Sequence, residues 1–359
     1  MRILYDGWPL LREPNSPAAR HLLTIVARLP EGVQATFALP DEAPKWLAGA
    51  ADFRLISAGN RQEGRARWEQ RTLPKIAKEI DAAAIHSTSS AAPLVSETPV
   101  IISPAGFGAM NKEPSGFGER LRTALGQGGM ARGARILWPS DLPVAIKSDR
   151  VITVPPITHP NYSPVPFGEQ ESPNIPGVEL PETYSMYHGP GTEAALRDLL
   201  QAWTWAAGPI GEYYPLVLLG LNDRDNERAE QLAAEMKLAD NIRILPPIDP
   251  QYLVGLYQNC SALYHPAGIS PWGDPVRHGM ACGIPVAAWE GAESNALAGP
   301  AAFLVERGDL RSFGAAMISV VVKDSLREQL SEKAVERSRV WREGQFASRL
   351  GEIYRDIGG

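Results

Sequence analysis

The stretch from residue 265 to residue 289, HPAGISPWGDPVRHGMACGIPVAAW, decides the fold of this chain. Its proline- and glycine-rich part, Pro266–Pro275, predicts a loop, because both residues disrupt regular structure. Gly283 follows the expected helix and stands where a glycine commonly ends one. Ile284–Trp289 is a short apolar run typical of a buried parallel strand. This loop, helix and strand predict an α/β protein that binds a phosphorylated ligand at a helix N-terminus.

The remaining sequence alternates predicted strands and helices in two series, as in doubly wound sheets. Prolines punctuate the polar segment Ser163–Glu182 between the two series, which predicts a linker. We therefore expect one α/β domain over residues 1–165, a proline-rich linker over 166–182 and a second α/β domain over 183–340. A last helix is expected within residues 341–359.

Length and composition agree with two ordinary α/β domains. The chain has 359 residues, of which 44% are hydrophobic and 21% charged, values typical of globular proteins. No run approaches the roughly 20 apolar residues of a membrane span, and the start predicts a charged strand in place of a signal peptide. Cys260 and Cys282 have no metal-ligand spacing, so we expect reduced core residues in a cytoplasmic protein.

The net charge of −6 is unevenly distributed. Residues 1–165 hold 19 Lys+Arg and 15 Asp+Glu, and the remainder hold 16 and 26. Much of the positive charge lies on one predicted helix, from Arg61 to Lys78. That face is either simply solvated or meets anionic lipid or a polyanionic glycan. A nucleic-acid site is not expected, because no basic stripe with interleaved aromatic residues occurs.

The quoted stretch resembles the donor-site signature of the family 4 retaining glycosyltransferases of the GT-B fold. Two positions that are glutamates in that family are Ser270 and His278 here. The residues that fall into the family's frame are Ser270, Pro271, Trp272, Gly273, Pro275, Met280, Ala281, Gly283, Pro285 and Val286. The resemblance implies two Rossmann-like domains facing a central cleft, with the C-terminal helix crossing back to the N-terminal domain.

The same resemblance implies nucleotide-sugar-dependent, retaining glycosyl transfer to a glycan or lipid-linked acceptor. It requires no cofactor and no metal, and a nucleotide-diphosphate sugar is the donor. It does require positive charge on the leaving diphosphate. The family's Arg, Lys and Asn at the first donor-domain helix are replaced by Glu193, Ala194 and Ala195.

Other residues are candidates to replace the missing cation. Arg197 either reaches the diphosphate or forms an i,i+4 ion pair with Glu193. Backbone N–H groups of the loop before the helix would cradle an anion. Arg277 and His278 either face the same ligand or are packed inside. The full donor-side set is Gly189, Gly191, Thr192, Arg197, Leu245, Ser270, Pro271, Trp272, Gly273, Asp274, Arg277 and His278.

On the acceptor side of the expected cleft, Asn15 and Ser16 replace the family's glycine-rich loop, and Ser103 stands where its catalytic-region histidine would be. His86, His188 and His265 each end a predicted strand. Each is either a functional group at the cleft or a structural histidine with satisfied hydrogen bonds. No pair has metal-ligand spacing.

Three functions from different classes follow. The first is a nucleotide-sugar-dependent glycosyltransferase with a non-standard donor site, at the inner face of the membrane if its basic domain binds lipid. The second is a catalytically silent GT-B subunit that partners or scaffolds an active transferase, favoured by the simultaneous substitutions at the donor site. A sugar-phosphate epimerase or phosphorylase on the same fold is the third, and no acid pair supports it.

Overall fold

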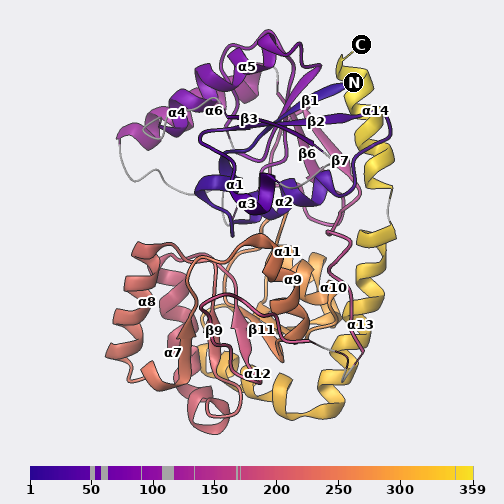
Figure 1. Cartoon of the computed structure of the whole chain (residues 1–359). Coiled ribbons are helices and arrows are strands. Elements are labelled where there is room, and N and C mark those ends of the chain that lie inside the picture. Colours follow the sequence, from indigo (N-terminus) through magenta and orange to yellow (C-terminus); the bar gives the residue numbers. More distant parts are fainter. Residues whose placement is uncertain are drawn as a thin grey trace. The chain divides into compact units, whose positions relative to one another are not determined.

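The computed structural model describes residues 1–48, 53–57, 64–89, 91–106, 117–132, 134–166, 169, 171–343 and 345–358. These residues form two compact units (Figure 1). Unit 1 comprises Met1–His159, Ser270–Gly273 and Glu343–Gly359, and unit 2 comprises Pro160–Ile269 and Asp274–Arg342. The chain thus enters unit 2 just before the proline-rich segment expected to be a linker. No helix in the described ranges has the length and apolar character to span a bilayer.

Unit 1 is built on a seven-stranded parallel sheet with the order β3-β2-β1-β4-β5-β6-β7. Along β1, Ile3 and Tyr5 pack with α2 and α14 on one face, while Leu4 packs with α5 on the other. This alternation is the period-2 pattern of a strand buried on both faces. The elements are β1 (Arg2–Asp6), α1 (Trp8–Arg12), α2 (Pro17–Val26), β2 (Gln34–Leu39), α3 (Lys45–Ala48), β3 (Phe53–Ser57), α4 (Arg65–Arg67), the π-helical turn η1 (Trp68–Thr72), α5 (Leu73–Glu79), β4 (Ala84–Ser87), β5 (Val100–Ile102), α6 (Phe117–Arg132), β6 (Arg135–Pro139), β7 (Val151–Val154) and α14 (Phe346–Gly358).

Unit 2 is built on a six-stranded parallel sheet with the order β10-β9-β8-β11-β12-β13. Helices α7, α8 and α12 pack with one apolar cluster on this sheet, and α10 contacts β11 and β12. The elements are β8 (Ser185–Tyr187), α7 (Glu193–Ile210), β9 (Leu216–Leu218), α8 (Asp223–Glu235), η2 (Ala239–Asn241), β10 (Ile242–Ile244), α9 (Pro250–Asn259), β11 (Ala262–His265), α10 (Pro275–Ala281), β12 (Val286–Trp289), α11 (Ala292–Leu297), η3 (Gly299–Ala301), β13 (Phe303–Val305), α12 (Leu310–Val322) and α13 (Asp324–Glu343).

The stretch that predicted the fold is loop, helix and strand, as expected. Gly283 ends α10 with a φ of 75°, and the N–H of Ile284 donates to the carbonyl of Gly279 at 2.9 Å. A glycine with positive φ after a helix turns the chain so that a following N–H group bonds to a helix carbonyl that would otherwise lack a hydrogen-bond partner. The two parallel sheets and the helices between their strands confirm the predicted α/β class.

Each sheet has one place where the strand order reverses, between β1 and β4 in unit 1 and between β8 and β11 in unit 2. Ligands of open α/β sheets bind outside the carboxyl ends of the strands at such switch points. The carboxyl ends in question are Asp6 and Ser87 in unit 1, and Tyr187 and His265 in unit 2. We therefore expect the ligand-binding site at one of these two edges.

The C-terminal helix α14 is fastened to the sheet of unit 1 by a chain of buried hydrogen bonds. The hydroxyls of Tyr5 and Tyr354 lie 2.8 Å apart, and the Tyr354 hydroxyl lies 2.6 Å from Nδ1 of His86. Nε2 of His86 lies 2.7 Å from Oγ of Ser103. Burial lowers the pKa of His86 to about 3, so the imidazole is neutral in the folded protein.

We expect acid to destabilise unit 1 through His86. The folded pKa lies below the unfolded value near 6.5, so the unfolded chain binds an extra proton as pH falls from about 6.5 towards 3. This linkage lowers the free energy of unfolding by about 2 kcal/mol between pH 7 and pH 5. His86→Gln should lose that part of the pH dependence in urea titrations at the two pH values. An unchanged pH dependence in the variant would contradict the buried neutral imidazole.

Candidate functional site

The loop that follows β8, residues 189–192, leads into the long helix α7 at the switch point of unit 2. Thr192 is the N-cap of α7, and its hydroxyl accepts from the N–H of Ala195 at 3.4 Å. The hydroxyl of Tyr187 donates to the carbonyl of Pro190 at 2.8 Å and so fixes the loop to β8. A Cβ at Gly189 would come within 2.4 Å of the Tyr187 ring. The loop is therefore closely packed, while the first N–H groups of α7 are directed out of the helix end.

A carboxylate and a guanidinium from α8 lie against this loop. Asp225 lies so close to Gly191 that a Cβ there would come within 2.2 Å of Oδ2. Arg228 donates through Nη1 to Oδ1 of Asp225 at 2.6 Å and to the carbonyl of Gly191 at 2.7 Å. Arg228 was not among the residues predicted for the site, because it belongs to the next helix along the chain and to none of the motifs quoted above.

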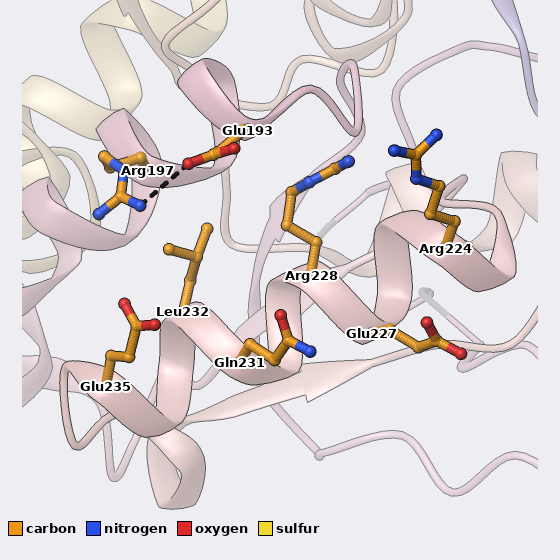
Figure 2. Close-up of a pocket in the computed structure, with 8 residues that line it drawn as sticks. All are labelled: Glu193, Arg197, Arg224, Glu227, Arg228, Gln231, Leu232 and Glu235. Atoms are coloured by element: carbon orange, nitrogen blue, oxygen red, sulfur yellow. Dashed lines mark hydrogen bonds and ion pairs between the residues drawn. The ribbon is translucent and has the colours of Figure 1, made fainter.

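The N-terminal part of α7 and the whole length of α8 line a groove of about 290 Å³, shown in Figure 2. The expected i,i+4 ion pair is present: Nη2 of Arg197 lies 3.1 Å from Oε1 of Glu193. Both side chains are largely exposed, so this pair contributes little stability and separates easily. Three arginines and three glutamates balance the charge of the groove, whose lining is Glu193, Arg197, Arg224, Glu227, Arg228, Gln231, Leu232 and Glu235.

Two other residues expected to face the donor, Arg277 and His278, are buried within unit 2. The guanidinium of Arg277 lies over the Trp341 ring, 4.8 Å from its centroid. The ring of His278 stacks on Tyr162 with centroids 4.2 Å apart and contacts the edge of Tyr257. Their exposed fractions are 1% each, so the second of the two alternatives, packing inside, describes their position in this structure.

The remaining donor-side candidates of unit 2, Asp274 and Leu245, and the two strand-end histidines of this unit have structural contacts. Asp274 is fully buried and caps α10, with Oδ1 accepting from the N–H of Val276 at 2.8 Å. Leu245 is buried after β10. Nδ1 of His188 lies 2.9 Å from the Tyr257 hydroxyl, and Nε2 of His265 lies 3.2 Å from the carbonyl of Gly268.

The expected donor loop, Ser270–Gly273, is packed in unit 1, although β11 before it and α10 after it belong to unit 2. Trp272 is 1% exposed, stacks on His21 at 4.5 Å and donates through Nε1 to the carbonyl of Leu137 at 3.1 Å. Oγ of Ser270 donates to the carbonyl of Trp272 at 2.8 Å and accepts from the N–H of Gly106 at 2.9 Å. In this conformation the loop directs its side chains into a protein core.

Gly273 is the tightest point of this loop, and we expect Gly273→Ala to destabilise unit 1 by more than 2 kcal/mol. Its φ is +63°, and an added Cβ would come within 2.0 Å of the carbonyl oxygen of Pro17. Gly268→Ala is a matched control five residues earlier, where a Cβ meets nothing within 4 Å. Thermal unfolding of the two variants checks this, and an equal effect of both would contradict it.

The acceptor-side candidates also have structural contacts. Ser16 caps α2, its hydroxyl accepting from the N–H of Ala19 at 3.2 Å. Asn15 is buried, and its carbonyl accepts from Nη1 of Arg20, whose Nε donates to the carbonyl of Gly273 at 2.9 Å. The structure therefore brings Asn15 and the donor loop together through Arg20. His86 and Ser103 bond to each other inside unit 1, as described above.

The carboxyl edge of unit 1 carries an ionic cluster that we define as Asp6, Arg65, Glu69 and Arg122. Asp6 Oδ2 accepts from Arg65 Nη2 and from Ser87 Oγ, both at 2.8 Å, and so bridges β1 and β4 at the switch point. Glu69 accepts from Nε of Arg65 at 2.7 Å and from Nε of Arg122 at 2.9 Å.

The charges of the ionic cluster shift its pKa values. Burial opposes the charge of Glu69, but Arg65 and Arg122 outweigh this effect and lower its pKa. Burial likewise opposes the charge of Arg65, but Asp6 and Glu69 raise its pKa. The π-helical turn η1 contains Glu69, and such turns occur frequently at functional sites.

The ionic cluster corrects the expectation that the basic residues from Arg61 to Lys78 share one exposed helix face. Arg65 is only 17% exposed and turns towards Asp6, whereas Arg67, Arg71, Lys75 and Lys78 are exposed. The beginning of that helix, from Arg61, lies outside the described residues. Within the described part of the chain, no group of three or more His, Cys, Asp and Glu residues could hold a metal ion.

Comparisons with known proteins agree with this architecture. Over 99% of both chains, sucrose-phosphate synthase from Thermosynechococcus elongatus superposes with a TM-score of 0.71 at 16% identity. Anabaena HepE, solved in complex with UDP and glucose, superposes with a TM-score of 0.71 at 14% identity, covering 99% of this chain and all of that one. These likenesses define the class: the protein has the GT-B fold.

The sequence of unit 2 resembles one family of glycosyltransferases. Residues 192–337 match the family model described as Glycosyl transferases group 1. A D-inositol 3-phosphate glycosyltransferase of Corynebacterium urealyticum is 26% identical over 163 residues. This match spans 42% of the chain and 38% of that relative. The second unit is therefore similar to group 1 glycosyltransferases over residues 192–337.

Proposed function

We propose that the protein binds a nucleotide-diphosphate sugar at the carboxyl edge of unit 2 and transfers the glycosyl group, with retention, to a glycan or lipid-linked acceptor. The observation that carries this proposal is the N-terminus of α7. There the loop 189–192 precedes an 18-residue helix, with Arg228 bonded to the carbonyl of Gly191. Helix N-termini bind phosphate through their unpaired N–H groups.

In this proposal two arginines supply the charge that the substituted family positions lack. Arg228 already lies against the loop, and Arg197 forms an exposed ion pair with Glu193. Positive charge on the diphosphate stabilises the charge that develops there as the glycosyl bond breaks. The neighbour structure with UDP and glucose supports a nucleotide-sugar ligand for this fold. No cofactor is required in this proposal.

A specific observation favours a second function, a catalytically silent GT-B subunit that partners an active transferase. The carboxylates of Glu193 and Asp225 flank the start of α7, so a dianionic diphosphate would meet negative charge there. Arg277 and His278 are meanwhile buried in aromatic contacts. In a silent subunit these residues have only structural roles.

A calorimetric and thermal-shift screen against UDP-, GDP-, ADP- and TDP-sugars distinguishes the two functions. A ligand that binds only the folded state stabilises it by an amount that grows with the logarithm of its concentration over its dissociation constant, even without turnover. Binding together with slow hydrolysis of the sugar supports the transferase, and Arg228→Gln should then weaken binding at least tenfold. Binding without hydrolysis or transfer supports the silent subunit. The absence of any shift at millimolar ligand overturns the donor site.

The exposed basic residues of unit 1 supply a place for a lipid-linked acceptor to approach. We propose that Arg67, Arg71, Lys75 and Lys78 contact the anionic inner face of the membrane, each contributing about 1 kcal/mol at the surface. Sedimentation with vesicles containing 30% phosphatidylserine, compared with neutral vesicles, measures this contact. Equal sedimentation with both would contradict it.

A further inference from the structure

The ionic cluster of unit 1 leaves one donor and one acceptor position open. Oε1 of Glu69 accepts three hydrogen bonds, the shortest from Nε of Arg65 and from Oγ of Ser89, both at 2.7 Å. Oε2 of Glu69 accepts one bond within the described structure, from Nε of Arg122 at 2.9 Å, although a carboxylate oxygen accommodates two. Nη1 of Arg65 is buried and has no hydrogen-bond partner among the described residues.

These open positions belong to the edge of unit 1 at which a ligand is expected. Asp6 ends β1 and Ser87 ends β4, and the bond between their side chains spans the switch point of the sheet. Arg65 and Arg122 are 17% and 27% exposed, so the cluster reaches the surface of unit 1. A buried polar atom without a partner is rare in folded proteins and costs free energy, which a bound ligand would recover.

The balance of charge in the cluster decides which class of ligand fits. Two carboxylates are paired with two guanidinium groups, so their formal charges cancel. Of the neighbouring exposed residues, Arg12 and Glu13 add one charge of each sign. A phosphate would lose its hydration here without meeting a net positive charge, which is costly. A sugar hydroxyl is uncharged and both donates and accepts, so a ligand with several hydroxyls matches the open N–H and the open carboxylate oxygen.

We infer that the ionic cluster binds the hydroxyl groups of an uncharged sugar or polyol, with Nη1 of Arg65 as the donor and Oε2 of Glu69 as the acceptor. Three contacts hold Arg65 in place for this role, namely its bonds to Asp6 and Glu69 and the ring of Trp8, whose centroid lies 5.2 Å from Cζ. Under the proposed transfer function, on which this identification rests, the ligand is the acceptor. That acceptor presents a neutral sugar to this edge, in place of a phosphate or a carboxylate.

NMR titration of the full chain with methyl glucoside, methyl mannoside and inorganic phosphate tests the class of ligand, at tens of millimolar because a single sugar binds weakly. The indole N–H of Trp68 reports where the ligand binds, because Nε1 donates to Oδ1 of Asp6 at 2.8 Å, and Trp68→Phe identifies its signal. We expect both glycosides to bind the wild type and to shift this signal. Phosphate should bind at least tenfold more weakly than the glycosides.

Arg65→Lys keeps a positive charge beside Asp6 and Glu69 but removes Nη1, so it should weaken the binding of methyl glucoside at least tenfold. Arg2→Lys is the matched control and should bind as the wild type does. Arg2 begins β1 at the amino edge of the same sheet, where its Nη1 donates to the carbonyl of Ile80. If Arg65→Lys does not fold, the Trp68 signal and the preference for glycosides over phosphate in the wild type still decide.

Tighter binding of phosphate than of the glycosides overturns the neutral ligand. Glycoside binding that leaves the Trp68 signal and the affinity of Arg65→Lys unchanged places the sugar elsewhere, and the absence of any binding overturns the site. Nucleotide-sugar binding that Arg228→Gln weakens is a separate measurement on unit 2. Its absence overturns the proposed donor site and leaves a glycoside site at the cluster standing, whereas its presence without glycoside binding does the reverse.

Discussion

Glu69→Gln should lower the free energy of unfolding of unit 1 by about 3 kcal/mol, because it leaves two guanidinium groups without their shared carboxylate. Glu69 is 2% exposed and is bonded by both Arg65 and Arg122. Breaking a buried ion pair costs about 3–5 kcal/mol, and the partial exposure of the two arginines, 17% and 27%, favours the lower end. Urea denaturation at pH 7, followed through the unfolding of unit 1, measures the loss.

The loss of stability caused by Glu69→Gln should itself depend on pH. The folded pKa of Glu69 is lowered, so its stabilisation is present above the unfolded value near 4.5 and is lost as pH falls through the folded value. The difference between the wild type and Glu69→Gln should therefore shrink in acid. Glu79→Gln is the control, because its pair with Lys75 is exposed and contributes less than about 1 kcal/mol. Equal losses in the two variants would contradict a buried ionic cluster.

Much of the fold was predictable from the sequence because its signals are local. Apolar runs such as Ile284–Trp289 and the glycine at position 283 define elements within a few residues. The edge strand β3 was missed, since its half-buried residues alternate without a strong apolar run. The short helix α1 was missed as well, because the sequence as far as Leu10 resembles the region of the family's first strand.

The site was less predictable because its contacts join distant parts of the chain. Sequence spacing correctly suggested the Glu193–Arg197 pair, which is one helical turn long. It did not suggest that Tyr162, more than a hundred residues earlier, stacks on His278. Nor did it suggest that Trp272 lies in unit 1, since a tryptophan in a loop motif has the same sequence signal whether it contacts a ligand or a core.

The start of α7 gives the second large effect: the double variant Glu193→Arg with Ala194→Lys should bind UDP-glucose and GDP-mannose at least tenfold more tightly than the wild type. Glu193 is 64% exposed and Ala194 is also exposed, so both positions accept long side chains. The substitutions change the local charge by +3 and release Arg197 from its pair. One unit charge at about 4 Å from another is worth roughly 1 kcal/mol in water and about 4 kcal/mol at an effective dielectric of 20.

Calorimetry on the wild type and the double variant measures this gain, which should decrease at high salt because the site is solvated. A matched control adds the same charge elsewhere in unit 2, through Ser325→Lys with Glu328→Arg on the exposed face of α13. An equal gain in the control would show a diffuse attraction in place of a site. If neither variant binds more tightly, the diphosphate does not lie at α7. Micromolar binding and brisk transfer by the wild type would instead show that arginines lining the groove, Arg197, Arg224 and Arg228, already supply the charge.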